Sequence, residues 1–285
     1  MIPDVDGDSV VYLNGQYLRL ADAKVSVLDR GFIFGDGIYE VVPFYQGKPF
    51  RMEEHLDRLE RSLASIGIDP GYSRDDWRAL VRDMAPRSPH SHFTVYLQIT
   101  RGPAKRDHAF PKDAQPTVFC MISPFSRPDA RLREQGLTAI SAPDIRWLRC
   151  EIKSVSLLGN VLAKQQAVQA GVDEVLQFRD GFLTEGASCN VWIARDGVLL
   201  APPLDNLILE GIRYRFLEEL AAQAGIPFEA RRISQSEVAQ ADEIMLSSAT
   251  KEVLPVVQYN GEPVGNGKPG PIYTALRAAY DQILG

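Results

Sequence analysis

The sequence predicts an α+β protein of two domains. Its 285 residues exceed the ~100–200 residues of an ordinary domain, so two hydrophobic cores are expected rather than one. Strand-like runs and amphipathic helical runs are mixed along the chain, without a repeat or a low-complexity tract. The segment Ser123–Asp129 contains two prolines and precedes a polar stretch, which indicates a linker. We therefore expect an N-terminal domain over residues 1–124, a linker over residues 125–132 and a C-terminal domain over residues 133–285.

Turn dipeptides and apolar spacings define the elements of the first domain. Asn14-Gly15 separates two strand-like runs within Val10–Leu20, which is typical of a tight β-hairpin. Leucine and isoleucine recur at spacings of three and four over Glu53–Ile66, which predicts an amphipathic helix that ends at Gly67. The remaining expected elements are a helix and two strands: Asp75–Met84, Phe93–Thr100 and Thr117–Ser123.

Two hairpins, further strands and three helices are expected in the second domain. Asp180-Gly181 and Asp196-Gly197 are each flanked by apolar runs, which is the strongest short signal for a hairpin. Strands are expected at Leu137–Ser141, Phe182–Glu185 and Glu243–Ser248. Helices are expected at Ser154–Gln169, Ile212–Ala224 and Ile272–Leu284.

Composition argues against several classes of function. The chain has 31 basic and 37 acidic residues, a net charge of −6, and no basic stripe, so general nucleic-acid binding is not expected. No membrane span is expected because no run of ~18 apolar residues occurs, and the acidic start Met1–Asp8 resembles no signal peptide, so we expect a cytoplasmic protein. His90 and His92 form the one close histidine pair, without a nearby carboxylate or cysteine, and no metal site is expected there. Three widely spaced cysteines are expected to be reduced thiols: Cys120, Cys150 and Cys189.

Lys153 is the most informative residue of the sequence. Apolar residues from Trp147 onward precede it and Val155 follows it, so we expect this segment to be buried on more than one side. A desolvated lysine amine loses its proton more readily and can form a Schiff base with a carbonyl compound. Taken alone, however, a surface lysine at a helix start is the ordinary interpretation.

Glu185 follows Lys153 by 32 positions (185 − 153 = 32) and ends a predicted strand at Gly186. A side chain at such a turn can point into a cleft, although a solvated strand end is the alternative interpretation. An acid opposite a Schiff-base lysine suits a cofactor whose pyridine nitrogen acts as an electron sink. The pair therefore suggests pyridoxal 5′-phosphate.

Three features of the sequence could hold a phosphate group. Gly211 stands at the entry to a predicted helix, where N–H groups and the positive end of the helix dipole favour an anion. The segment Ser247–Thr250 ends a strand and offers hydroxyl and N–H donors. Arg58, on the first predicted helix, has a guanidinium that can bind an anion in bidentate fashion, and a solvated helix face is the alternative.

Several motifs resemble those of the class IV aminotransferases, the fold type IV pyridoxal-phosphate enzymes. This family includes D-amino acid, branched-chain and (R)-amine transaminases, together with aminodeoxychorismate lyase. The resemblance runs nearly end to end, with its motifs in family order: Asp29–Glu40, Glu54–Leu59, the Lys153 segment, the Glu185 segment and Leu209–Ile212. It implies a smaller N-terminal α/β domain and a larger, β-barrel-like C-terminal domain with helices. It also implies a homodimer whose active sites lie near the subunit interface.

The resemblance implies a role for each candidate residue. Lys153 would bind pyridoxal 5′-phosphate as a Schiff base and carry the proton of a 1,3 shift, while Glu185 would pair with the protonated pyridine nitrogen. Leu209 would pack against the cofactor ring. The residues implied at the phosphate are Arg58, Gly211, Ile212, Arg213, Ser248 and Ala249.

Within the family, the sequence is most similar to the D-amino acid aminotransferases. Asp144–Cys150 and Thr100–Pro111 resemble segments of that subgroup. There, a tyrosine holds the substrate α-carboxylate with an arginine and a histidine of the neighbouring subunit, and these roles fall on Tyr39, Arg106 and His108. The implied reaction moves an amino group from a D-amino acid, foremost D-alanine, to a 2-oxo acid such as 2-oxoglutarate. The alternatives are a branched-chain or (R)-amine transaminase, aminodeoxychorismate lyase and a non-catalytic cofactor carrier.

Three positions depart from the family pattern. Arg213 stands where relatives often have a threonine, and Ala249 replaces a hydroxyl residue. The turn after Glu185 reads Ala187-Ser188-Cys189 instead of a run of serines. Backbone N–H contacts survive such changes, so cofactor binding is still expected. Arg213 is expected either to strengthen the anion site or to face solvent.

Overall fold

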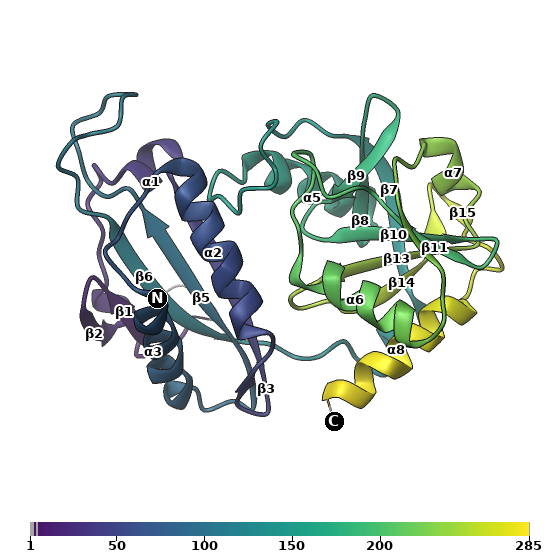
Figure 1. The fold of residues 1–285 in the computed structure, drawn as a ribbon, viewed down its shortest axis with the longest axis horizontal. Coiled ribbons are helices and arrows are strands. Elements are labelled where there is room, and N and C mark those ends of the chain that lie inside the picture. Colours follow the sequence, from purple (N-terminus) through teal and green to yellow (C-terminus); the bar gives the residue numbers. More distant parts are fainter. Residues whose placement is uncertain (1–2, 4, 285) are drawn as a thin grey trace. The chain divides into compact units, whose positions relative to one another are not determined.

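The chain divides into two compact units, each of which is described by itself (Figure 1). This computed structural model describes residue 3 and residues 5–284, so part of the predicted acidic start lies outside the described residues. The first unit comprises Met1–Ser126 and Ile152–Leu157, and the second comprises Arg127–Glu151 and Leu158–Gly285. Lys153 therefore belongs to the first unit, although the chain on both sides of its short segment belongs to the second.

The first unit is an antiparallel sheet with helices. The strand order is β2-β1-β6-β5-β3-β4, and every neighbouring pair is antiparallel. The strands are β1 (Val10–Leu13), β2 (Gln16–Arg19), β3 (Gly37–Tyr45), β4 (Lys48–Pro49), β5 (His92–Thr100) and β6 (Thr117–Pro124). The helices are α1 (Arg30–Phe34), α2 (Met52–Ile66) and α3 (Arg74–Met84), with 3-10 turns at Leu20–Asp22 and Ala85–Arg87.

Helices α2 and α3 bury their apolar sides against the same core. In α2, the predicted spacing places Leu56, Leu59 and Leu63 in this core, together with Trp77 from α3. Gly67 ends α2 in the left-handed conformation, with a φ of 61°, which glycine adopts without a steric penalty. The predicted bounds of both helices are confirmed to within one residue.

Strand β3 is the longest element of the first unit that the sequence patterns did not predict. Most of its residues are buried, so the alternation of apolar and polar residues that indicates a strand is absent. Pro43 also interrupts the run, although β3 still pairs with β5 over its full length. The predicted hairpin at the start of the sheet is confirmed, because Asn14 and Gly15 both have positive φ values, 47° and 89°.

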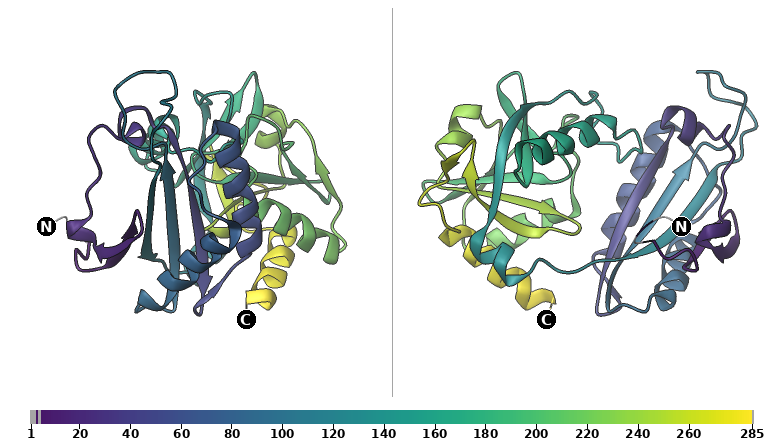
Figure 2. Two further views of the ribbon diagram at one scale, coloured as in Figure 1. Left: turned by 60° about the vertical axis from the view of Figure 1, so that its left-hand side comes forward. Right: turned by 180° about the vertical axis from the view of Figure 1, so that it is seen from behind.

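The second unit is a nine-stranded curled sheet with helices (Figure 2). The strand order is β12-β11-β10-β13-β14-β7-β8-β9, and β15 pairs with β14. The strands are β7 (Leu137–Pro143), β8 (Glu174–Arg179), β9 (Phe182–Gly186), β10 (Asn190–Arg195), β11 (Val198–Ala201), β12 (Phe228–Ala230), β13 (Glu243–Ser248), β14 (Glu252–Tyr259) and β15 (Glu262–Pro263). The helices are α4 (Ala130–Gln135), α5 (Leu158–Ala170), α6 (Ile212–Gln223), α7 (Gln235–Ala239) and α8 (Pro271–Leu284).

Strands β9 and β10 reveal how far this sheet curls. They stand far apart in the order of hydrogen-bonded strands, yet only residues 187–189 connect them. The Gly186 N–H also donates to the Cys189 carbonyl at 2.8 Å. The sheet must therefore curl until β9 returns to β10, which makes a partly closed barrel with an apolar interior. The predicted α+β fold with a barrel-like C-terminal domain is confirmed.

Helix α5 begins four residues later than predicted, at Leu158 instead of Ser154 (158 − 154 = 4). Ser154 forms an antiparallel bridge with Ile38, and the Val155 N–H donates to the Gly37 carbonyl at 3.0 Å. The backbone around Lys153 thus extends along β3. Pairing with a strand that was not predicted overrides the local preference for a helix.

The outer side of α5 is unusually apolar. Leu158, Val161 and Leu162 are 71%, 59% and 45% exposed, whereas Ala163 and Ala167 are buried. An ordinary surface helix buries its large apolar residues and exposes its polar ones. An exposed stripe of this kind is typical of a surface that another chain covers.

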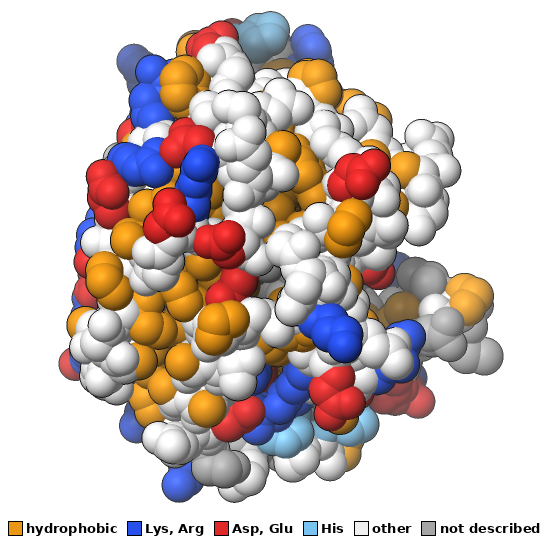
Figure 3. Space-filling model, turned by 90° about the vertical axis from the view of Figure 1, so that its right-hand side faces the viewer, with side chains coloured by type: hydrophobic (Ala, Val, Ile, Leu, Met, Phe, Trp, Pro, Cys, Tyr) orange, Lys and Arg blue, Asp and Glu red, His pale blue; other side chains and the backbone are white. Residues whose placement is uncertain are grey.

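Charged residues of both signs lie among apolar ones on the face drawn in Figure 3. Within residues 3 and 5–284, no helix is long and apolar enough to cross a membrane. The same residues contain no cluster of three or more metal-ligating side chains.

Candidate active site

Strand β3 and helix α2 hold the backbone of Lys153. The Tyr39 N–H donates to the Lys153 carbonyl at 2.9 Å, and the Lys153 N–H donates to Ser62 Oγ at 3.3 Å. Lys153 Nζ lies 4.0 Å from the centroid of the Tyr39 ring, a cation–π distance. The predicted Schiff-base lysine and the predicted substrate tyrosine are therefore neighbours within the first unit.

The Lys153 segment is less buried than its composition suggested. Ile152 and Cys150 are buried, but Lys153 itself is only half-buried, and Trp147 and Leu148 are 44% and 60% exposed. The prediction that this segment is buried on more than one side is wrong. Apolar composition does not distinguish a core segment from a surface that an apolar partner covers.

Arg58 is buried and paired, so the alternative of a solvated helix face is wrong. Its Nε and Nη2 donate to Glu40 Oε1 and Oε2 at 2.6 and 2.9 Å, and His55 Nδ1 lies 2.7 Å from Glu40 Oε2. Burial opposes ionisation of Glu40, but the Arg58 guanidinium holds the pKa of that carboxyl far below its usual range. Glu40 thus orients the Arg58 guanidinium and offsets part of its charge.

The predicted carboxylate-binding pair lies on an exposed loop. The Arg106 guanidinium and the His108 ring each lie 5.4 Å from the Phe34 ring, so the structure brings the two side chains to one aromatic group. Arg30 donates to the carbonyls of Asp107 and His108 and so anchors the loop from α1. In the part of the chain that the structure describes, no hydrogen bond or ring contact joins Tyr39 to this pair.

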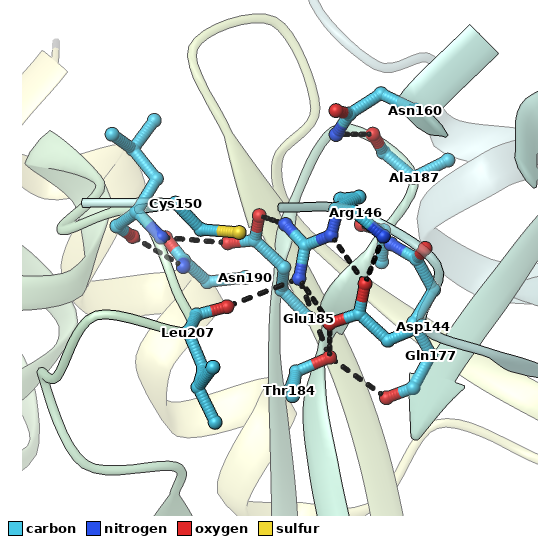
Figure 4. A network of polar contacts seen from close by, with 12 residues as sticks. Asp144, Arg146, Cys150, Asn160, Gln177, Thr184, Glu185, Ala187, Asn190 and Leu207 are labelled. Atoms are coloured by element: carbon cyan, nitrogen blue, oxygen red, sulfur yellow. Dashed lines mark hydrogen bonds and ion pairs between the residues drawn. The ribbon is translucent and has the colours of Figure 1, made fainter. Parts of the chain in front are cut away.

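Glu185 lies at the end of β9 with only 7% of its surface exposed, so the alternative of a solvated strand end is wrong. Arg146 Nη1 forms an ion pair with Glu185 Oε1, and the Leu209 N–H donates to Oε2 at 2.9 Å (Figure 4). Burial raises the pKa of Glu185, and the Arg146 guanidinium and the Leu209 N–H oppose that rise. These two donors fix the direction of the carboxylate.

A polar network behind Glu185 holds Arg146 in place (Figure 4). Arg146 Nε and Nη2 donate to Asp144 Oδ1 and Oδ2 at 2.9 and 2.8 Å, and Nη2 also donates to the Leu207 carbonyl at 3.1 Å. Burial opposes ionisation of Asp144, but the hydrogen bond and charge of Arg146 lower the pKa of that carboxyl to about 2. Asp144 and Arg146 lie in the segment Asp144–Cys150, but no role was predicted for either residue. The available signal was the pattern Asp-x-Arg, in which an acidic and a basic residue stand two positions apart.

The helix entry at Gly211 has the geometry of an anion site. Gly211 caps α6 without a side-chain hydrogen bond, and the first intrahelical bond runs from the Tyr214 N–H to the Gly211 carbonyl at 2.9 Å. The N–H groups of Ile212 and Arg213 precede it and point out of the helix end, as they do in every helix. A Cβ at Gly211 would lie 2.1 Å from Asn190 Oδ1, so a larger residue would have to displace the Asn190 side chain, which donates to the Leu209 carbonyl at 2.9 Å.

Arg213 is buried at 1% exposure, so the expectation that it faces solvent is wrong. Its Nε donates to the Tyr280 hydroxyl at 3.0 Å, and its Nη2 donates to the Ala249 carbonyl at 3.2 Å. The contact with Ala249 joins the start of α6 to the turn after β13. Ser248 in the same turn accepts the Lys251 N–H on Oγ at 3.1 Å, which leaves its own hydrogen available for an anion.

The second unit therefore combines the features that pyridoxal 5′-phosphate requires. Glu185 offers a buried, oriented carboxylate for a pyridine nitrogen, and the Leu209 N–H that orients it lies two residues before Gly211. The α6 entry and the Ser248 turn, held together through Arg213, offer N–H and hydroxyl donors for a phosphate. These residues fit the cofactor that the sequence suggested.

Comparison with known proteins agrees with the family that the sequence resembles. The family model described as amino-transferase class IV matches residues 37–259. A D-alanine aminotransferase of Staphylococcus epidermidis is 41% identical over 275 residues, which cover 96% of this chain and 97% of the relative. A D-alanine aminotransferase of Bacillus licheniformis is 37% identical over 274 residues, which cover 96% of each chain.

Branched-chain aminotransferases are among the solved structures with this fold. The enzyme of Escherichia coli superposes with a TM-score of 0.92 and 25% identity, covering 97% of this chain and 95% of the other. The enzyme of Thermoproteus uzoniensis gives a TM-score of 0.89 and 25% identity, covering 98% and 95%.

Proposed function

Because the chain belongs to the class IV aminotransferase family, we propose that it transfers the amino group of a D-amino acid, foremost D-alanine, to a 2-oxo acid such as 2-oxoglutarate. The protein is an aminotransferase, and its cofactor is pyridoxal 5′-phosphate. The observation that carries the choice of substrate is the 41% identity with a D-alanine aminotransferase over nearly the whole chain. Identity with the branched-chain aminotransferases of Escherichia coli and Thermoproteus uzoniensis is 25%.

Glu185 is proposed to pair with the protonated pyridine nitrogen of the cofactor ring. When bound, pyridoxal phosphate withdraws electrons from the Cα atom of an amino acid joined to its aldehyde carbon, which makes the Cα proton acidic. An ionised Glu185 would accept the hydrogen of the protonated pyridine nitrogen. Arg146 favours that ionised form and, with the Leu209 N–H, keeps both carboxylate oxygens in place.

Lys153 is the proposed catalytic residue. Its Nζ would hold the cofactor through the aldehyde carbon and, as a free amine, would move a proton between the substrate Cα and that carbon. The Tyr39 ring lies 4.0 Å from Nζ and limits where the amine can move. The bonds from Tyr39 N–H and to Ser62 Oγ hold the backbone beneath this side chain.

Phosphate binding is proposed for the two segments that Arg213 joins. The donors are the N–H groups at the start of α6, including that of Ile212, and the Ser248 hydroxyl. Leu209 would pack on the ring, since its N–H already bonds to Glu185. Arg58, oriented by Glu40, would add charge to the phosphate from the first unit.

The substrate α-carboxylate is proposed to bind Tyr39 together with Arg106 and His108 of a neighbouring subunit. Arg106 and His108 are exposed in the single chain, as this role requires, and Arg30 fixes their loop. A guanidinium fork suits a carboxylate because it can donate two parallel hydrogen bonds.

A homodimer is part of the proposal. The outer side of α5 exposes Leu158, Val161 and Leu162, and Val27 and Phe32 of the first unit are each 73% exposed. Burying each such side chain in an interface would contribute about 1.5–3 kcal/mol. The proposed carboxylate site also requires a second copy of the chain.

The three unbridged cysteines agree with a reducing compartment such as the cytoplasm.

A spectral assay tests the proposed function. The purified protein with added pyridoxal phosphate should show a visible absorption band that Lys153→Ala protein lacks. D-alanine should abolish the band and 2-oxoglutarate should restore it, while L-alanine should leave it unchanged. A wild-type protein without this band would contradict the whole proposal. Conversion by L-leucine, or by a simple (R)-amine, in place of D-alanine would favour the branched-chain or (R)-amine alternative, and pyruvate formed from 4-amino-4-deoxychorismate would favour the lyase.

A further inference from the structure

Two adjacent charged residues close the turn that follows β13. Lys251 and Glu252 come directly after the turn that contains Ser248 and Ala249. Glu252 is fully buried and accepts from Arg127 Nε at 2.8 Å and Arg277 Nη1 at 2.7 Å. Its φ of 56° is unusual for a residue with a side chain, so its contacts must hold the backbone there.

Lys251 extends to the opposite side of the turn, toward the start of β8. Its Nζ lies 3.1 Å from Oε2 of Glu174, whose side chain is fully buried. The same oxygen accepts from Cys189 Sγ at 3.5 Å, and Glu174 Oε1 accepts the Ala187 N–H at 3.2 Å. One carboxylate thus joins the turn after Ser248 to the loop that follows Glu185.

The loop on the other side of this link makes further hydrogen bonds. The Gly186 carbonyl accepts from Gln177 Nε2 at 2.9 Å, and the Ala187 carbonyl accepts from Asn160 Nδ2 at 2.8 Å. Lys251 is therefore attached, through Glu174, to a rigid part of the barrel. Its own backbone N–H positions the Ser248 hydroxyl, as described above.

We propose that Lys251, paired with Glu174, is a positioning residue for cofactor phosphate: the pair holds the Ser248 turn in the conformation that binds the phosphate, without touching the cofactor. This inference rests on the proposed function. Removal of the ammonium would leave the buried Glu174 carboxylate without its cation and would loosen the turn. The larger consequence is expected at the phosphate end of the cofactor, because Lys251 bonds to the Ser248 turn, whereas the printed partners of Glu185 are Arg146 and the Leu209 N–H.

The experiment compares the affinity of apoprotein for pyridoxal 5′-phosphate and for pyridoxal, which lacks the phosphate. Lys251→Met should raise the Kd for pyridoxal phosphate about tenfold. A change of this size is expected if the loosened turn loses one hydrogen bond to the charged phosphate. The Kd for pyridoxal should change less than about twofold. Glu174→Gln, which keeps the shape of the side chain, should reproduce the effect, and Lys251→Arg should largely restore the affinity.

The matched control is Arg231→Met, which removes another ion pair of the second unit, the 2.8 Å contact of Arg231 with Glu237. It should lower the apoprotein Tm less than Lys251→Met, because the Arg231 and Glu237 side chains are 33% and 26% exposed, and it should leave both affinities unchanged. Equal changes for pyridoxal phosphate and pyridoxal, or no change for either, would overturn the positioning role and leave the proposed function standing. Failure of the wild-type protein to bind pyridoxal phosphate would overturn both.

Discussion

Substitution of Arg146 by methionine would test whether this guanidinium keeps Glu185 ionised. Arg146 bonds to both Glu185 and Asp144, and all three side chains are at most 9% exposed. Removing one partner from a buried charged network costs about 3–5 kcal/mol of folding free energy. The folded variant can recover part of this cost by binding a proton, which would raise the Glu185 pKa further.

The sign of the pH dependence follows from that proton. An acid whose pKa is raised in the folded state binds more protons folded than unfolded, so its destabilising effect grows as the pH rises from the unfolded to the folded pKa. At pH 8, Arg146→Met should therefore show the full loss of about 3–5 kcal/mol. At pH 6, two units lower, the loss should be smaller by up to about 2.7 kcal/mol, since each pKa unit corresponds to 1.36 kcal/mol.

Urea unfolding of the apoprotein at pH 6 and pH 8 measures both quantities. The control is Arg179→Met, because Arg179 contacts Asp144 Oδ1 at 3.1 Å without touching Glu185. It should cost about 1–3 kcal/mol and change little between the two pH values. A loss for Arg146→Met that is equal at pH 6 and pH 8, or below about 1 kcal/mol at pH 8, would refute the reasoning.

Three further predictions follow from the two units. Arg106→Ala should raise the KM for D-alanine by about 10–100-fold, the equivalent of a lost charged hydrogen bond, and an equal loss for an amine without a carboxylate would contradict the proposed role. Leu158→Glu with Val161→Glu should convert a dimer to a monomer in sedimentation equilibrium, whereas the same changes at the exposed Arg19 and Asp22 should not. Glu40 has a pKa far below its ordinary 4.5, so its contribution to stability is complete above pH 4.5 and is lost as the pH falls through the lowered value. Acid unfolding of the wild-type protein should therefore be steeper than that of Glu40→Gln, and superimposable curves would contradict this account.

The sequence predicted those elements whose signals are local. Asn14-Gly15 specifies its hairpin by the backbone conformations that these two residues tolerate, and α2 follows from the spacing of its leucines. Strand β3 could not be predicted in this way, because burial of most of its residues removes the alternation that marks a strand. Helix α5 starts later than predicted for the same reason, because Ser154 pairs with β3, the strand that was not predicted.

At Lys153 and Glu185, one residue type in one motif carries the proposed chemistry, so the sequence alone could propose both residues. The supporting pairs of the candidate site join residues that are distant in sequence. Arg58 meets Glu40 from 18 positions away, and Arg146 meets Glu185 from 39 positions away. Which charges pair depends on how the strands and helices fold together, and no local pattern encodes it.

One contact joins Arg213 and Ala249, two of the positions that depart from the family pattern. The resemblance implies hydroxyl residues at both positions, whereas here the Arg213 side chain donates to the carbonyl of Ala249 at 3.2 Å. A threonine hydroxyl at each position could donate to the phosphate directly, but it could not bridge from α6 to this turn. The long guanidinium side chain makes that bridge and is itself held by Tyr280. Phosphate binding in this chain should therefore depend less on side-chain hydroxyls and more on backbone N–H groups, whose geometry the Arg213 bridge and the Lys251–Glu174 pair maintain.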